Sequence, residues 1–173
     1  MSAVMLIRDK HKYMINPSLN RKHVLFTERV SGNSAWSLID SIAELLISKG
    51  NAVTYCKWDD GSSVPELTIP QGVVVKTISV SGKRKPWDVW KQESNFSREF
   101  VVFLDKVKPD IVHTGFCLPG NVARRIAGRQ PSIKVVTTYH ELFGSLNFYL
   151  KWVSRRTEKY VDRQCYISQT VAR

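Results

Sequence analysis

Short apolar runs that are rich in β-branched residues alternate with longer segments of helical periodicity along most of the chain. The runs lie at residues 22–28, 52–58, 72–78, 111–114, 133–139 and 164–167. Those at 111–114 and 133–139 are too short for helices and lack the apolar/polar alternation of a half-exposed sheet. They are therefore predicted to be central strands of a parallel sheet that is covered on both faces.

The segments between the runs carry apolar residues at three- and four-residue steps, as amphipathic helices do. Helices are predicted at residues 34–49, 95–108, 121–129 and 146–163, with Gly50 as the stop of the first and Ser168 as the cap of one more. This alternation predicts a Rossmann-like, doubly wound α/β fold of strand order 3-2-1-4-5-6, because right-handed crossovers leave few other arrangements. The apolar residues expected to be buried in it are Val24, Phe26, Ile111, Val135 and Val136.

The composition fits one globular domain in a reducing compartment. The chain has 173 residues, 43% hydrophobic and 24% charged, which is ordinary for a soluble domain. Residues 1–21 are predicted to be a poorly ordered basic leader, and residues 22–173 to form the domain. No secretory signal or apolar run of about 20 residues is found, and Cys56, Cys117 and Cys165 are isolated. The cytoplasm is the predicted location.

Several residues with binding potential follow the predicted strands. Ligands of an open parallel sheet bind in the crevice outside the carboxyl ends of its strands. The residues expected to bind substrate there are Gly32, Asn33, His113, Thr114 and Glu141, with His140 beside them. At a strand–helix junction a glycine lets backbone N–H groups approach a phosphate or sugar oxygen. The same glycine is equally compatible with a tight turn alone.

His140 is the predicted catalytic residue, while Glu141 and His113 each have two interpretations. His140 follows a strand, and an imidazole with an ordinary pKa of about 6.5 donates readily to sugar hydroxyls or phosphate oxygens. Glu141 is either a catalytic base or the cap of the next helix. His113 is either a ligand-binding residue or a hydrogen-bonded histidine of the core.

Several classes of enzyme are disfavoured by the motifs. The first strand–helix turn holds one glycine, Gly32, where a dinucleotide fingerprint needs three. A nucleophile elbow, a Walker loop, a kinase signature and a metal-ligand cluster are all missing from the sequence. A self-contained hydrolase, ATPase, kinase or dehydrogenase is therefore not predicted, and no metal is expected.

Charge is the strongest departure from average composition. The formal net charge of +11 predicts attraction to anions. Basic and aromatic residues concentrate in one stretch and along one predicted helix: Lys83, Arg84, Lys85, Trp87 and Trp90, then Lys151, Arg155 and Arg156. Such a mixture suits the head-group boundary of an anionic membrane. The alternative is a solvated basic face whose tryptophans pack in the core.

Several segments together resemble the amino-terminal half of a GT-B glycosyltransferase, specifically of glycosyltransferase family 4. They are the first strand with its glycine-bearing loop, SKGNAVTYC at 48–56, VKPDIVHTG at 107–115, KVVTTYHE at 134–141 and YVDRQCYISQTVAR at 160–173. The resemblance covers residues 22–173. It implies an acceptor-binding domain, a second domain, absent here, for the nucleotide-sugar, and transfer with retention and without a metal. It also implies that Gly32 approaches the donor diphosphate and His140 reaches the transferred sugar, although the family usually shows two glycines where this chain has Ser31-Gly32.

The resemblance makes the chain part of an enzyme that transfers a sugar from a nucleotide-sugar to a carbohydrate or lipid-linked acceptor, as in polysaccharide biosynthesis. The nucleotide-sugar is a co-substrate, and no cofactor is expected. The chain alone is expected to be inactive until the other domain is supplied in cis or in trans. Two alternatives stay open: a non-catalytic module for anions or membranes, and half of a sugar-nucleotide epimerase. A nucleic-acid partner is not expected, because no reading motif for it occurs.

Overall fold

The central element is a six-stranded sheet in which every neighbouring pair of strands is parallel. The structure, a computed structural model, describes residues 21–29, 33–59, 61, 69–80, 88–115, 117–139 and 148–166. The strands are β1 (His23–Arg29), β2 (Ala52–Asp59), β3 (Val74–Ser79), β4 (Ile111–Thr114), β5 (Lys134–Tyr139) and β6 (Arg163–Tyr166). Their order is β3-β2-β1-β4-β5-β6. The predicted Rossmann-like fold and its strand order are confirmed, with β4 and β5 inside the sheet.

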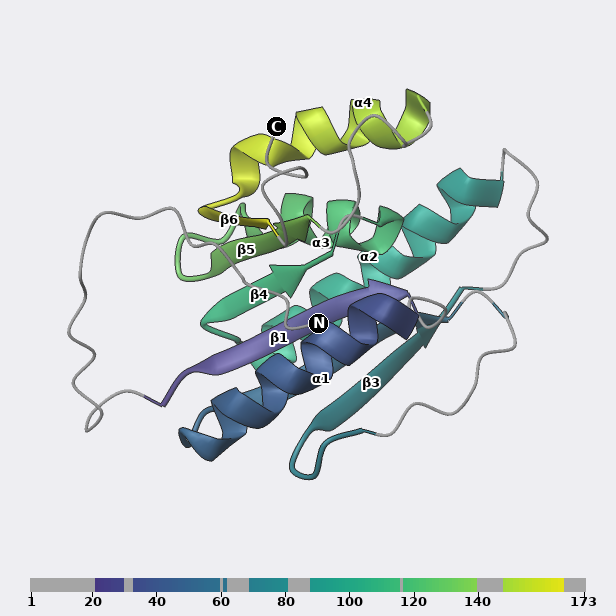
Figure 1. Cartoon of the computed structure of the whole chain (residues 1–173). Helices are drawn as coiled ribbons and strands as arrows, with labels where there is room; N and C mark the ends of the chain where they lie inside the picture. Colours follow the sequence, from purple (N-terminus) through teal and green to yellow (C-terminus); the bar gives the residue numbers. More distant parts are fainter. Residues whose placement is uncertain are drawn as a thin grey trace.

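Helices cover both faces of this sheet (Figure 1). They are α1 (Asn33–Ser48), α2 (Asp88–Val107), α3 (Leu118–Ala127) and α4 (Phe148–Thr157), which continues into the 3-10 turn η2 (Glu158–Tyr160). The helix α1 lies on one face, α2 and α3 lie on the other, and α4 packs against α3. From β1 the sheet extends in both directions. Because crossovers between parallel strands are right-handed, the helices of the two directions lie on opposite faces.

Three predicted helix boundaries are wrong, and one of them is the start of α3, which is Leu118 rather than residue 121. The helix α2 begins at Asp88 rather than at residue 95. The hydrophobic pattern does not predict its first turns, because Trp90 there is exposed and no buried apolar stripe marks them. The helix α4 ends at Thr157 rather than at residue 163, and the chain then tightens into η2 before β6. The end of α1 is as predicted: Gly50 follows it with φ of 81°, a left-handed conformation that glycine adopts without strain. The predicted helix start at 146 and the Ser168 cap lie outside the described residues.

The core has one cluster on each face of the sheet. On the α2 and α3 face, Leu25, Val112 and Val135 are fully buried beneath the rings of Phe96 and Phe100. On the α1 face, strand residues pack against the helix, and the buried members are Val24, Phe26, Trp36, Ile39, Ala43, Val53 and Tyr55. Each buried aromatic side chain contributes on the order of 2–3 kcal/mol to folding through the apolar area removed from water.

The predicted burial is confirmed for Val24, Phe26 and Val135, but Ile111 and Val136 are only half-buried. Ile111 pairs with Val24, which faces α1, so Ile111 lies on the α1 face as well. His113 is two residues further along β4 and shares this face, and its partner Val136 therefore lies there too. The helix α1 packs against β1 and β2. These two side chains therefore lie at the margin of its cover.

Two aspartates fix neighbouring strands at their amino ends. Asp110 precedes β4, and its carboxylate accepts from the His23 backbone N–H at 2.8 Å and from Lys22 Nζ at 3.0 Å. Asp162 precedes β6 and accepts in the same way from the Val135 backbone N–H at 2.9 Å. The backbone hydrogen bond is the main cause that lowers the pKa of each carboxyl group. The two contacts fix the register of β4 against β1 and of β6 against β5. This register determines which residues end each strand at the opposite edge of the sheet.

Replacing Phe100 by alanine should lower the free energy of unfolding by about 3–5 kcal/mol, because a fully buried ring is lost and a cavity remains. Phe100 stacks on Phe96 with ring centroids 5.3 Å apart. Urea denaturation followed by circular dichroism measures the change. The matched control is Val102→Ala on the same helix, where 68% exposure predicts a change below about 0.5 kcal/mol. Equal losses in the two variants would contradict the described packing.

Candidate functional site

The site lies where β1 and β4 end side by side at the carboxyl edge of the sheet. The strand order reverses between these two strands, so the helices that follow them leave toward opposite faces. Ligands of such a sheet bind outside the strand ends at the switch point, so this is where the crevice is expected. Glu28 and Arg29 end β1 on one side of it, while Thr114, Gly115 and the start of α3 lie on the other.

A buried carboxylate stands at the base of this crevice. Glu28 is 3% exposed, and its Oε1 accepts from the Arg29 backbone N–H at 2.9 Å. The carboxylate lies so close to Gly115 that a Cβ atom there would overlap Oε2. The Cys117 thiol also hydrogen-bonds to Glu28, and burial, with the negative charge of Glu28, raises the pKa of that thiol well above its ordinary value. Cys117 is thus a protonated hydrogen-bond donor rather than a nucleophile.

Two glycines allow β4 and α3 to approach this closely. A Cβ on Gly115 would meet Glu28, and a Cβ on Gly120 would meet the backbone carbonyl of Gly115. The first turn of α3 therefore rests directly on the exit of β4. This contact sets where the α3 amino terminus lies relative to the crevice.

A buried arginine joins the ends of β4 and β5 beneath the crevice. Arg124 on α3 is fully buried, and its Nη2 donates to the Gly115 carbonyl at 3.0 Å while its Nε donates to Thr114 Oγ1 at 3.3 Å. Thr114 Oγ1 is 2.8 Å from Thr137 Oγ1 on β5. The guanidinium also lies 5.8 Å from the Tyr139 ring. A buried charge held by this many partners fixes both strand ends.

His113 is a core histidine. It is 9% exposed, its Nε2 is 2.8 Å from Thr138 Oγ1, and its ring packs on Phe26 at 4.8 Å. Burial lowers its pKa to about 4, so the ring is neutral near pH 7. Of the two roles that the sequence left open, the geometry supports the hydrogen-bonded core residue. His113 and Thr114, both expected to bind substrate, thus lie at the predicted edge but beneath its surface.

The other predicted site residues are placed only in part. Gly32, His140 and Glu141 lie outside the described residues, and Asn33 begins α1 with its side chain outside them as well. The segments that carry them directly follow β1 and β5, the two strands that flank β4 at this edge. The contributions of Glu28, Cys117 and Arg124 were missed by sequence reasoning. Glu28 was the detectable one, because a carboxylate ending an apolar strand needs partners when buried.

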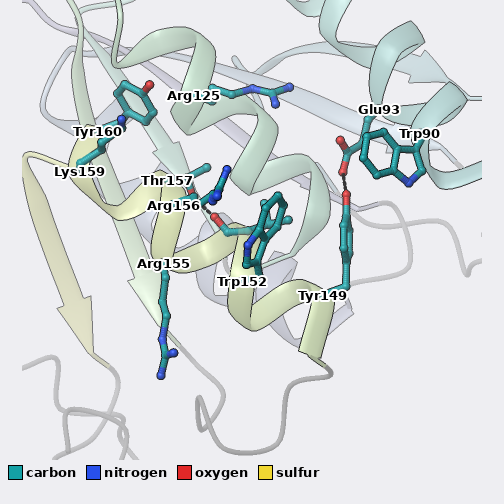
Figure 2. Close-up of a pocket in the computed structure, with 11 residues that line it drawn as sticks. Trp90, Glu93, Arg125, Tyr149, Trp152, Arg155, Arg156, Thr157, Lys159 and Tyr160 are labelled. Carbon is teal, nitrogen blue, oxygen red and sulfur yellow. Dashed lines mark hydrogen bonds between the residues drawn. The ribbon is translucent and has the colours of Figure 1, made fainter.

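The predicted basic residues are divided between described and undescribed parts. Lys83, Arg84, Lys85 and Trp87 lie outside the described residues. Trp90 on α2, with Arg155 and Arg156 on α4, lines a groove of about 470 Å³ between α2, α3 and α4 (Figure 2). Lys151 is also on α4 and is half-buried. Trp90 is 68% exposed, so it does not pack in the core as the alternative interpretation required.

Neither a metal centre nor a membrane span is found in the parts of the chain that the structure describes. Among those residues no three histidine, cysteine, aspartate or glutamate side chains are grouped to hold a metal ion. No described helix is both long enough and apolar enough to cross a bilayer.

The fold is that of one half of a GT-B protein, as comparison with solved structures shows. MurG of Acinetobacter baumannii matches at 15% identity and a TM-score of 0.57, over 86% of this chain and 42% of its own. Sucrose-phosphate synthase of Thermosynechococcus elongatus matches at 14% identity and 0.59, over 83% and 42%. UDP-GlcNAc 2-epimerase of Methanocaldococcus jannaschii matches at 15% identity and 0.59, over 82% and 38%. At these identities the likeness shows the fold alone, and the match covers about two fifths of each of these proteins.

The family follows from the sequence profile of Glycosyltransferase Family 4, which matches residues 36–173. The chain belongs to glycosyltransferase family 4, and its fold is that of the amino-terminal GT-B domain. A search of curated protein sequences gave no significant match.

Replacing Gly115 by alanine should lower the free energy of unfolding by about 1–3 kcal/mol, because the new methyl group collides with the Glu28 carboxylate. In a Glu28→Ala background the methyl group has room, so the additional loss should fall below about 0.5 kcal/mol. Urea denaturation of the four proteins of this cycle measures the coupling. The same penalty in both backgrounds would show that Glu28 is not the obstacle.

His113 should make stability fall in acid. Its pKa is about 4 when folded, against an ordinary value of 6.5, so the unfolded chain takes up the proton first as the pH falls. Its contribution is complete above about pH 6.5 and is lost between there and about pH 4, with a slope of up to about 1.4 kcal/mol per pH unit. Urea denaturation across this range should show a shallower slope for His113→Gln. Identical slopes in the two proteins would refute a neutral buried His113.

Proposed function

We propose that this chain is the acceptor-binding half of a glycosyltransferase that moves a sugar from a nucleotide-sugar to a carbohydrate or lipid-linked acceptor with retention of anomeric configuration. The observation that carries the proposal is the match to family 4 together with the β1–β4 switch point, where the ligand crevice of an open parallel sheet is expected. The side chains beneath the strand ends are buried and hydrogen-bonded, and in this proposal the segments that follow β1 and β5 supply the ligand contacts.

The roles at the crevice divide by position. Gly32 and Asn33, where β1 passes into α1, approach the donor diphosphate, since the N-terminus of a helix favours negative charge. His140 and Glu141, after β5, reach the transferred sugar. Beneath them, His113 and Thr114 hold the strand ends through their contacts with Thr138 and Thr137. In this arrangement the first four touch substrate, and the last two position the loops.

The nucleotide-sugar is a co-substrate of this reaction, and no cofactor or metal takes part. A second GT-B domain, in the same polypeptide or in a partner, holds the donor, so the half alone does not complete a turnover. We place the reaction in polysaccharide biosynthesis, in the cytoplasm and at the inner face of the membrane, where lipid-linked acceptors meet nucleotide-sugars.

The test supplies the chain with a donor-binding domain of the same family, fused or added in trans, together with a nucleotide-sugar and an acceptor. Proton NMR of the product should show a new glycosidic bond with the donor's anomeric configuration, and the chain alone should give none. Conversion of the nucleotide-sugar into an epimer without transfer would assign the chain to a sugar-nucleotide epimerase instead. An inverted product would refute retention.

Replacing His140 by alanine in that assembly should lower kcat by about 10²-fold or more, in the range that a positioned donor or base contributes. The free energy of unfolding should change by less than about 1 kcal/mol, since a polar residue after a strand adds little to the core. Val102→Ala, at an exposed position of α2 far from the strand ends, is the control and should keep the full turnover. Unchanged turnover in His140→Ala would leave that residue a structural one.

A further inference from the structure

The groove between α2, α3 and α4 concentrates cations and exposed aromatic rings. Its lining residues include four cations, Arg125, Arg155, Arg156 and Lys159, and one carboxylate, Glu93. The remaining described residues that line it are Trp90, Tyr149, Trp152, Val153, Thr157 and Tyr160. The groove therefore has a net positive lining with aromatic walls. The groove is separate from the switch point. Two successive residues of α3 point to different places: Arg124 donates to the Gly115 carbonyl at the strand ends, and Arg125 lines the groove.

Hydrogen bonds hold the three helices that form this groove. Asn121 on α3 is fully buried, and its Oδ1 accepts from Ser154 Oγ at 3.2 Å and from Thr157 Oγ1 at 2.9 Å. These bonds fasten α4 to α3. At the other end, the Tyr149 hydroxyl donates to Glu93 Oε1 at 2.6 Å and fastens α4 to α2. The groove is thus a preformed feature, and its carboxylate is engaged in holding the helices together.

Two aromatic rings of the groove, and a third that precedes its Tyr149, are exposed to water rather than packed in the core. Trp90 is 68% exposed, Trp152 is 42% exposed, and Phe148, at the start of α4, is 84% exposed. Arg156 lies over the Trp152 ring at 4.3 Å, and Figure 2 shows the two side chains together, with Arg155 pointing away from them. Exposed large apolar rings beside cations are typical of surfaces that meet a partner.

We propose that this groove docks the protein on an anionic phospholipid surface, with a lipid phosphate among Arg125, Arg156 and Lys159 and the rings of Trp90, Trp152 and Phe148 at the acyl boundary. Charge complementarity assigns the anion, because cations outnumber the carboxylate. The rings assign the lipid: indole tolerates a half-wet position at the head groups, and the phenyl ring gains only from an apolar one. The inference rests on the proposed function, because a lipid-linked acceptor would lie in the membrane on which the protein docks.

The test measures co-sedimentation of the chain with phosphatidylcholine vesicles that contain or lack phosphatidylglycerol, a measurement that involves no sugar transfer. We expect binding to the anionic vesicles alone, lost near 0.5 M salt, where the Debye length falls to about 5 Å or less. The variant Arg156→Gln with Lys159→Gln should weaken the partition coefficient by about 30-fold. The matched control, Lys49→Gln with Lys106→Gln, removes the same charge from exposed positions at the ends of α1 and α2 and should weaken it less than threefold.

Trp152→Ala separates a lipid surface from a plain polyanion. It should weaken vesicle binding by about tenfold and leave binding to heparin within about twofold, because only the lipid receives the ring. Circular dichroism and urea midpoints establish that each variant is folded. Since transfer and docking are measured apart, vesicle binding without transfer would count against the proposed function alone.

Four results would overturn the inference. They are no preference for anionic vesicles, equal losses in the groove pair and the control pair, displacement by millimolar glycerol phosphate, and tighter binding to an oligonucleotide than to vesicles with the same dependence on the groove pair. The third result would assign the groove to a soluble phosphate, and the fourth to nucleic acid.

Discussion

Parallel pairing of β1 with β2 on one side and with β4 on the other is the constraint on which the rest of the structure depends. Because both pairs are parallel, all three strands end at one edge, and the chain must leave β1 and β4 by crossovers of opposite direction. The helix α1 then covers one face, and α3 covers the other. This divergence places the expected ligand crevice outside the two strand ends, so its place is a consequence of topology.

Close packing lies beneath this expected crevice and fixes the two strand ends. The glycine at 115 admits the Glu28 carboxylate, the glycine at 120 admits the β4 exit, and Arg124 donates to the same short segment. Buried charges are costly unless they are hydrogen-bonded, and here the polar groups bond to backbone atoms of the strand ends. In the proposed function the contacts with the sugar belong to the segments that follow β1 and β5, and the buried contacts fix the strand ends from which those segments leave.

The two functional surfaces are separate because they use different parts of the same helices. The crevice uses the strand ends and the amino terminus of α3, whereas the groove uses outward side chains of α2, α3 and α4. This separation suits the two proposals: one edge serves the proposed second domain and its nucleotide-sugar, and another face serves the proposed membrane contact. The polar contacts of Asn121 with α4 connect the two, since α3 belongs to both.

The sequence by itself determined the strand order and the two central strands, and with them the edge at which the candidate binding residues are expected. Those follow from periodicity and from the fixed handedness of crossovers, which are local rules. Only the tertiary structure decided that His113 is a core residue, that Glu28 and Arg124 form the base of the crevice, and that Trp90 shares a groove with α4. These depend on which side chains meet across strands and helices far apart in the chain. The spacing of apolar residues along a segment shows the face on which a residue lies. Its burial and its partners depend on which other segments the folded chain packs against that face.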